Sequence, residues 1–238
     1  MIYGFIIAAG NQSRFHSELP KALVPVGSSK VPLLHFNVSM MREYCDRVFV
    51  VCSTTNRPYF DAYNKEGYGE VDLIEIESGL GCGDAVYKAL NSIQFYNDFD
   101  RCYIQWGDSI QLRETYDKLS SYATYRSVLL PCTIEDTPYV QIVPTASSVK
   151  ARFSKLGDKT ERGYHDLSLF LCNCVDLKSN MRSIVDQYFN GTNYDLRNNE
   201  FSFLDVFNYS YITAEIVDVG EVPMNSFNSI EDLNRLCL

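Results

Sequence analysis

The sequence is short of positive charge and of long apolar runs, and each shortage excludes a class of protein. Among 238 residues, 21 Lys and Arg stand against 30 Asp and Glu, a formal net charge of −9. This balance argues against binding to nucleic acid and against a polybasic membrane surface. No apolar stretch reaches the roughly 20 residues that a membrane span needs, and the first ten residues lack the basic start of a signal peptide. We therefore expect a cytoplasmic protein with no membrane span and no nucleic-acid partner.

Cysteine pairs and two familiar nucleotide-binding signatures are missing as well. The eight cysteines contain no CxxC pair, so a disulfide framework is not expected in a chain of this length. Cys172 and Cys174 alternate in a strand-like run, and we expect them to share a face in the core. Neither GxGxxG nor GxxxxGKS/T occurs, which disfavours dinucleotide-binding and P-loop sites. The 46% hydrophobic and 21% charged residues that are present are typical of a globular protein.

Strand-like and helix-like segments alternate through the first half of the chain. This alternation predicts an α/β fold with a doubly wound, mostly parallel sheet over about residues 1–135. The second half, about residues 136–238, has strand patterns with short turns, one of them over 166–177, and a closing helix over 229–237. It predicts a smaller mixed β/α part. Because no repeat or linker occurs, we expect a single domain over 1–238, with its ligand at the carboxyl ends of the parallel strands.

A loop directly after the first strand has an order of residues that core packing does not require. The run AAGNQSRFHSELPKALVPV covers residues 8–26. Gly10 allows backbone angles and a close approach that a Cβ would forbid. The neighbouring amides can face phosphate oxygens, and Arg14 and Lys21 add positive charge. A ligand-free loop with a surface Arg and Lys is the alternative interpretation.

Three further segments are expected near the same edge of the sheet. Asp108 ends the fourth strand within WGDS and is placed to hold Mg²⁺, although a strand-end Asp is also a common turn or cap residue. The glycines of SGLGCGDA, residues 78–85, offer amides to a planar base; a plain strand-to-helix turn with Asp84 at the helix start is the alternative. Asn228 would begin the last helix, either as an N-cap or as an oxygen donor to a metal opposite Asp108.

The order of these segments resembles one known family. Five residues separate Arg14 from the Pro-Lys pair, and Gly107-Asp108 follows the fourth strand. This order is similar to that of the sugar-phosphate nucleotidylyltransferase family, in particular the pyrophosphorylase domain of N-acetylglucosamine-1-phosphate uridylyltransferase. That group has a Leu-Gly-Thr-Gly base loop, which residues 80–83 resemble, and an aromatic-Gly-Asp, which residues 106–108 match.

The resemblance implies a Rossmann-like nucleotidyltransferase fold and a magnesium-dependent reaction. An NMP group would pass from an NTP to a phosphorylated sugar or polyol, pyrophosphate would leave, and an activated NDP-sugar or NDP-alcohol would form. By the same resemblance, Arg14 and Lys21 would bind the triphosphate, and Asp108 and Asn228 would ligate Mg²⁺. The implied nucleotide-binding residues are Ala8, Ala9, Gly10, Leu80, Gly81, Cys82, Gly83 and Gly107.

Several positions depart from the family pattern. Gln12 stands where the family usually has Gly, and Ile76 stands where the uridylyl enzymes have the Gln that reads uracil, so UTP is not supported. The Asn-Thr-Gly that recognises an acetamido group is absent, which disfavours N-acetylglucosamine phosphate. We expect His165 and Asp166 to line the acceptor pocket instead, with a structural turn His as the alternative. A contact of Lys155 or Lys159 with the acceptor phosphate stays open.

Two other functions remain open from the sequence. A nucleotide-sugar-dependent glycosyltransferase shares this topology but typically has Asp-x-Asp after the equivalent strand, where this chain has Gly107-Asp108-Ser109. A non-catalytic NTP-binding module is the other alternative; the presence of Arg14, Lys21 and Asp108 argues against it, and Gln12 keeps it open. The sequence also leaves a homo-oligomer, the base of the NTP and the identity of the acceptor open.

Overall fold

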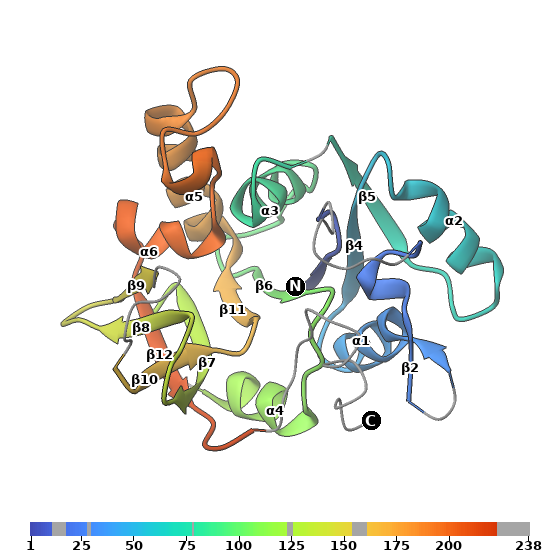
Figure 1. Ribbon diagram of the computed structural model, residues 1–238, viewed down its shortest axis with the longest axis horizontal. Helices are drawn as coiled ribbons and strands as arrows, with labels where there is room; N and C mark the ends of the chain where they lie inside the picture. Colours follow the sequence, from blue (N-terminus) through green and yellow to red (C-terminus); the bar gives the residue numbers. More distant parts are fainter. Residues whose placement is uncertain (11–17, 28–29, 78, 123–125, 154–160, 223–238) are drawn as a thin grey trace.

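A mixed ten-stranded sheet with helices on both faces forms the centre of the molecule (Figure 1). The computed structural model describes residues 1–10, 18–27, 30–77, 79–122, 126–153 and 161–222. The strand order is β5-β4-β1-β6-β11-β7-β10-β8-β9, with β12 beside β7. The expected class is confirmed, because a parallel region formed by the first half is continued by a smaller mixed part from the second half.

The strands β1, β4, β5 and β6 form the parallel part of the sheet. β1 pairs with β4 and β6, and β4 pairs with β5, all in parallel register. Near-continuous apolar runs such as IYGFII fit this place, because a parallel strand is buried on both faces. The strands are β1 (Ile2–Ile7), β4 (Arg47–Ser53), β5 (Asp72–Ile76), β6 (Arg101–Trp106), β7 (Val128–Glu135), β8 (Val140–Pro144), β9 (Val149–Phe153), β10 (Gly163–Asp166), β11 (Leu169–Asn173) and β12 (Ala214–Asp218).

Helices cover both faces of the sheet. The helices are α1 (Leu33–Arg42), α2 (Arg57–Lys65), α3 (Cys82–Asn91), α4 (Arg113–Ser121), α5 (Cys174–Tyr188) and α6 (Val206–Tyr209), with 3-10 turns η1 (Lys21–Leu23), η2 (Arg197–Asn199) and η3 (Phe203–Asp205). Figure 1 shows α3 beside α5. Phe5 packs on the α3 and α5 face, while its neighbour Ile6 packs on the α1, α2 and α4 face. Among the described helices, none is long and apolar enough to cross a membrane. A small ribbon joins β2 (Pro25–Val26) to β3 (Val31–Pro32).

The second half departs from the expected pattern at two points. β11 lies between β6 and β7 and is antiparallel to both, so the parallel region ends at β6 rather than near residue 135. The strand predicted over 166–177 is also wrong at its end, because Asn173 caps α5 by accepting the N–H of Asp176 at 2.9 Å. Cys174 therefore begins a helix, although it and Cys172 are both buried as expected. The predicted closing helix over 229–237 lies outside the described residues.

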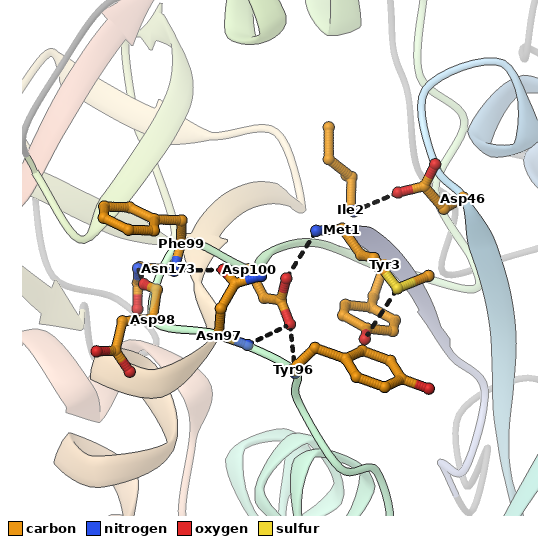
Figure 2. A network of polar contacts seen from close by, with 10 residues as sticks. All are labelled: Met1, Ile2, Tyr3, Asp46, Tyr96, Asn97, Asp98, Phe99, Asp100 and Asn173. Atoms are coloured by element: carbon orange, nitrogen blue, oxygen red, sulfur yellow. Dashed lines mark hydrogen bonds and ion pairs between the residues drawn. The ribbon is translucent and has the colours of Figure 1, made fainter.

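A buried carboxylate fixes the amino ends of β1 and β6 (Figure 2). The ammonium of Met1 lies 2.6 Å from Asp100 Oδ1, and the N–H groups of Tyr96 and Asn97 donate to Oδ2 at 2.7 and 3.2 Å. The carboxylate has no exposed surface. Burial alone would raise the pKa of Asp100, but the ammonium and the two N–H donors outweigh burial, and the pKa lies below its ordinary value.

Candidate active site

Lys21 and Asp108, which lie 87 residues apart in the chain, form an ion pair at the carboxyl edge of the sheet. Pro20 fixes the backbone just before Lys21 opens η1, and Asp108 lies in the turn after β6. Lys21 Nζ is 3.1 Å from Asp108 Oδ2, and the two side chains are 14% and 35% exposed. The pair is therefore accessible to a ligand in part. Arg14, predicted to join it, lies outside the described residues.

Close backbone packing sets the geometry beneath this pair. The N–H of Gly107 donates to the carbonyl of Ile7 at 2.9 Å, which ties the end of β6 to the end of β1. A Cβ on Gly107 would lie only 3.2 Å from Ala8 Cβ and 3.3 Å from Ala22 Cβ. Glycine at this position thus lets β1, β6 and η1 converge. The structure brings Ala8, Gly107, Lys21 and Asp108 together at this edge, and their roles in binding and catalysis stay predictions.

Gly10 is exposed just beyond Ala9, which is buried. Its φ is not in the left-handed region, and a Cβ built on it would meet nothing within 4 Å. Our expectation that Gly10 is required for its backbone angles is therefore wrong. The other reason for a glycine here is that a ligand approaches the open side of Gly10 closely. That approach stays a prediction.

The glycines of the predicted base loop pack against another part of the chain. Gly81 has φ +103°, and a Cβ on it would collide with the carbonyl of Phe201. The N–H of Gly83 donates to Phe201 O at 2.8 Å, and the N–H of Phe201 donates to Leu80 O at 2.8 Å. The expectation of a free amide is thus wrong at Gly83. Nucleotide contacts of Leu80, Gly81 and Cys82 stay predictions.

The segment 201–203 connects this loop to the end of β6, and sequence reasoning missed its role. The N–H of Phe203 donates to Cys82 Sγ at 3.3 Å, and burial raises the pKa of the Cys82 thiol. The Phe203 ring lies 5.6 Å from the Trp106 ring and 4.6 Å from the Phe170 ring, measured between centroids. The base loop therefore stands in fixed relation to the Gly107-Asp108 turn. The apolar run FSFLDVF reads as an ordinary core helix, so no signal singled it out.

Asp84 stabilises the predicted base loop, residues 80–83, through side-chain contacts. Its Oδ2 accepts the N–H of Leu80 at 3.1 Å and pairs with Lys88 Nζ at 2.8 Å, and its Oδ1 accepts the hydroxyl of Tyr194 at 2.9 Å. The Asp84 side chain is buried. The structure supports the alternative interpretation of Asp84, in which it fixes a strand-to-helix turn.

The two predicted acceptor residues differ in their surroundings. His165 lies on β10, separated from β6 in the sheet by β11 and β7, and its Nδ1 is 3.4 Å from Val140 O. Asp166 is buried, its Oδ1 accepts the N–H of Ser168 at 3.0 Å, and burial raises its pKa. Ser168 in turn accepts the N–H of Trp106 at 3.1 Å. Asp166 is thus connected to the end of β6 through Ser168, and an acceptor contact of either residue stays a prediction.

Among the described residues, Asp108 is the predicted metal ligand at this edge. They contain no cluster of three or more His, Cys, Asp or Glu side chains that could hold an ion, and Asn228 lies outside them. Mg²⁺ is usually held by one or two carboxylates together with substrate phosphates and water. Since a carboxylate has two oxygens, Asp108 can pair with Lys21 and still ligate a metal, so the residues present fit Mg²⁺.

The fold is that of nucleotidyltransferases. A solved inositol-1-phosphate CTP transferase from T. maritima has a TM-score of 0.72 at 14% identity, covering 97% of this chain and 90% of that one. A putative glucose-1-phosphate thymidylyltransferase from Bacillus anthracis, in complex with a sucrose, has a TM-score of 0.70 at 13% identity and covers 99% and 93%. HddC from Yersinia pseudotuberculosis, solved also with GMP-PN, has a TM-score of 0.67 to 0.68 at 16% identity and covers 98% and 97%.

By sequence the chain is similar to the bifunctional protein GlmU. It is 24% identical to that of Wolbachia sp. subsp. Brugia malayi over 239 residues, and 25% identical to that of Wolbachia pipientis wMel over 187 residues. These alignments include 97% and 76% of this chain, but only 55% and 41% of the relatives, so the chain spans about half their length or less. No family model matches the chain. The resemblance to sugar-phosphate nucleotidyltransferases predicted from the sequence is confirmed by these similarities.

Proposed function

We propose that this protein is a magnesium-dependent nucleotidylyltransferase. It transfers an NMP group from an NTP to a phosphorylated sugar or polyol, releases pyrophosphate, and makes an activated NDP-sugar or NDP-alcohol. The observation that carries the proposal is the Lys21–Asp108 pair, because it places a cation and a carboxylate at the carboxyl edge of a parallel sheet. Ligands of open α/β sheets bind at this edge.

The chain's own groups supply positioning and charge in this reaction. An oxygen of the acceptor phosphate attacks the α-phosphorus of the NTP in line, and pyrophosphate leaves on the opposite side. Because the acceptor phosphate is already nucleophilic, no general base is needed. Lys21, with Arg14, neutralises charge on the triphosphate and lets two anions approach each other. Each such contact contributes about 3 kcal/mol to the stabilisation of the transition state.

Asp108 would hold Mg²⁺ in this proposal, together with Asn228 and the phosphate oxygens. Bound Mg²⁺ supplies Lewis-acid charge on the transferring phosphate. Lys21 orients the carboxylate of Asp108 before substrate arrives, because Lys21 Nζ lies 3.1 Å from Asp108 Oδ2. The donor set of one carboxylate, one amide oxygen and phosphate oxygens is typical of magnesium sites.

The base is not assigned, and Ile76 argues against uracil. Its side chain is buried in the core, and its carbonyl accepts the N–H of Thr54 at 3.0 Å. An apolar buried side chain offers no group that reads the edge of a pyrimidine. The solved structures of similar fold include a CTP transferase for inositol-1-phosphate and a putative thymidylyltransferase for glucose-1-phosphate, which gives the first pairs to test.

The test is a pyrophosphate-release assay that crosses four NTPs with sugar, inositol, polyol and choline-type phosphates. We expect rapid release with one or a few pairs, a requirement for Mg²⁺, and no release in excess EDTA. Asp72→Asn is the matched control for Asp108→Asn, because Asp72 forms an exposed ion pair with Arg47 at 2.9 Å at the opposite end of the strands. Full activity in EDTA, or in Asp108→Asn, would refute the proposal.

The glycosyltransferase alternative is tested in the same experiment. Ser109, where such enzymes typically have a second Asp, is fully buried, and its hydroxyl donates to Trp106 O at 2.8 Å. The turn therefore presents one carboxylate rather than two. Transfer of sugar from an NDP-sugar, without pyrophosphate release from any NTP, would favour the alternative.

A further inference from the structure

A buried network of polar side chains lies beneath the turn that carries Asp108. Its members come from α1, from β6, from the turn itself and from α4. All five are at most 6% exposed. They are Asn37, Gln105, Ser109, Gln111 and Tyr116.

Ser109, the residue after Asp108, is bonded through each of its polar groups. Its N–H and its hydroxyl both donate to Trp106 O, at 3.1 and 2.8 Å. Its carbonyl accepts two amide donors, Asn37 Nδ2 at 2.9 Å and Gln105 Nε2 at 3.0 Å. Both lone pairs of this carbonyl are therefore in use, and the peptide group next to Asp108 is held from two directions.

The network extends from Ser109 to two more elements. The hydroxyl of Tyr116 on α4 donates to Gln105 Oε1 at 2.6 Å, which fixes the orientation of the Gln105 amide. Gln111 Nε2 donates to the carbonyl of Leu167, between β10 and β11, and lies 3.4 Å from Ser109 Oγ. The turn after β6 is thus connected to α1, to α4 and to the start of β11.

Chain reversal alone does not require this arrangement. The two bonds from Ser109 to Trp106 already close the turn, and one donor would satisfy its buried carbonyl. Buried amides are costly unless all of their groups find partners, so further donors brought from other elements indicate that a single geometry is selected. The Lys21–Asp108 pair cannot select it alone, because partly exposed ion pairs are weak.

We propose that Asn37, Gln105 and Gln111 are positioning residues that hold the turn so that Asp108 meets the substrate phosphates and Mg²⁺. The expected effect of these residues on catalysis rests on the proposed function. None of the three is expected to touch substrate. Asn37 and Gln105 act through the carbonyl of Ser109, the neighbour of Asp108. Gln111 acts through the hydroxyl of Ser109 and the carbonyl of Leu167.

The test is Asn37→Leu, which nearly preserves volume and removes one donor to Ser109 O. We expect kcat to fall about tenfold or more and the half-saturating Mg²⁺ concentration to rise by a similar factor, with KM for the NTP within about threefold. Amide hydrogen exchange at Gly107 and Ser109 should become about tenfold faster. If Asn37→Leu does not fold, Gln111→Met serves as the second variant, with the same expected results.

Asn208→Leu is the matched control. Asn208 on α6 donates to Ala151 O at 2.8 Å and accepts the N–H of Ala151 at 3.1 Å, on the outermost strand β9. The control variant therefore loses partly buried amide bonds away from the turn, and we expect unchanged kcat, Mg²⁺ requirement and exchange at Gly107 and Ser109. Equal losses in both variants would overturn the proposal, since they would reflect general destabilisation.

The proposal and the proposed function fail in different ways. If the wild-type protein transfers nucleotide but a folded Asn37→Leu keeps its kcat and Mg²⁺ requirement, the positioning role is overturned. If the wild-type protein transfers no nucleotide with any pair, the proposed function fails, and hydrogen exchange then decides whether these amides hold the turn. Unchanged exchange at Gly107 and Ser109 in Asn37→Leu would overturn that part too.

Discussion

The strand β6 has an aspartate beyond each of its ends, and the two carboxylates have opposite surroundings. Asp100, just before the strand, has no exposed surface and is held by the Met1 ammonium and two backbone N–H groups (Figure 2). Asp108, after the strand, is 35% exposed and pairs with Lys21 at 3.1 Å. The same residue type on one strand thus serves stability at one end and remains accessible to ligand at the other.

The difference lies in what surrounds each carboxylate rather than in its own chemistry. The Met1 ammonium and two backbone N–H groups satisfy the buried Asp100 within the protein, so little capacity remains for a ligand. Asp108 is instead fixed indirectly, through the backbone of its neighbour Ser109, while its Oδ2 pairs with the partly exposed Lys21. Support from the backbone leaves a functional side chain available.

Asp108→Asn should show the largest difference between the roles of the two aspartates. We expect nucleotidyl transfer to fall by about 10² to 10³-fold or more, because the proposed metal ligand is lost. The free energy of unfolding should change by less than about 1 kcal/mol, since the ion pair is partly exposed. Pyrophosphate release and urea denaturation measure the two effects, and Lys21→Ala should behave alike. A large loss of stability with retained activity would reverse the comparison.

Asp100→Asn should show the opposite pattern. An amide in place of the carboxylate loses the ion pair with Met1, and its NH2 donor faces either the Met1 ammonium or the N–H groups of Tyr96 and Asn97. We expect a loss of roughly 2 kcal/mol in the free energy of unfolding and unchanged kcat in the protein that remains folded. Urea midpoints and the pyrophosphate assay check both, and a loss of kcat without loss of stability would contradict it.

Two glycines of the carboxyl edge allow a finer comparison. Gly81→Ala forces a side chain into a left-handed backbone against the Phe201 carbonyl, and should cost about 2 kcal/mol of stability. Gly10→Ala places its Cβ in open space, and should change stability by less than about 0.5 kcal/mol while raising KM for the NTP. Thermal unfolding and kinetics distinguish them. An unchanged KM for the NTP in Gly10→Ala would contradict the prediction that the ligand approaches Gly10 closely.

The smallest expected effect is a pH dependence from Asp100. Its pKa in the folded protein lies below its ordinary value, so its contribution to stability is present above that ordinary value and is lost as the pH falls through the lowered pKa. Urea midpoints of the wild-type protein should decline over this acidic range more steeply than those of Asp100→Asn. Parallel declines in the two proteins would show that Asp100 titrates alike in the folded and unfolded states.

The sequence predicted that Lys21 and Asp108 lie close together, through the geometry of parallel strands. Lys21 and Asp108 follow strands that pair side by side, so their meeting could be predicted from the order of motifs alone. The sequence could not show that the N–H of Gly83 donates to the carbonyl of Phe201, because that contact joins segments far apart in the chain. The network of Asn37, Gln105 and Gln111 was missed for the same reason: single amides in apolar segments carry no local pattern.

The insertion of β11 between β6 and β7 ties the two halves of the molecule together. A fragment that stopped near residue 135 would leave β6 with one edge of unpaired backbone groups next to Asp108. Such an edge invites association with other chains. The first half of the chain is thus unsuited to independent expression, and recombination between relatives at that boundary would need to carry β11 along with β1, β4, β5 and β6.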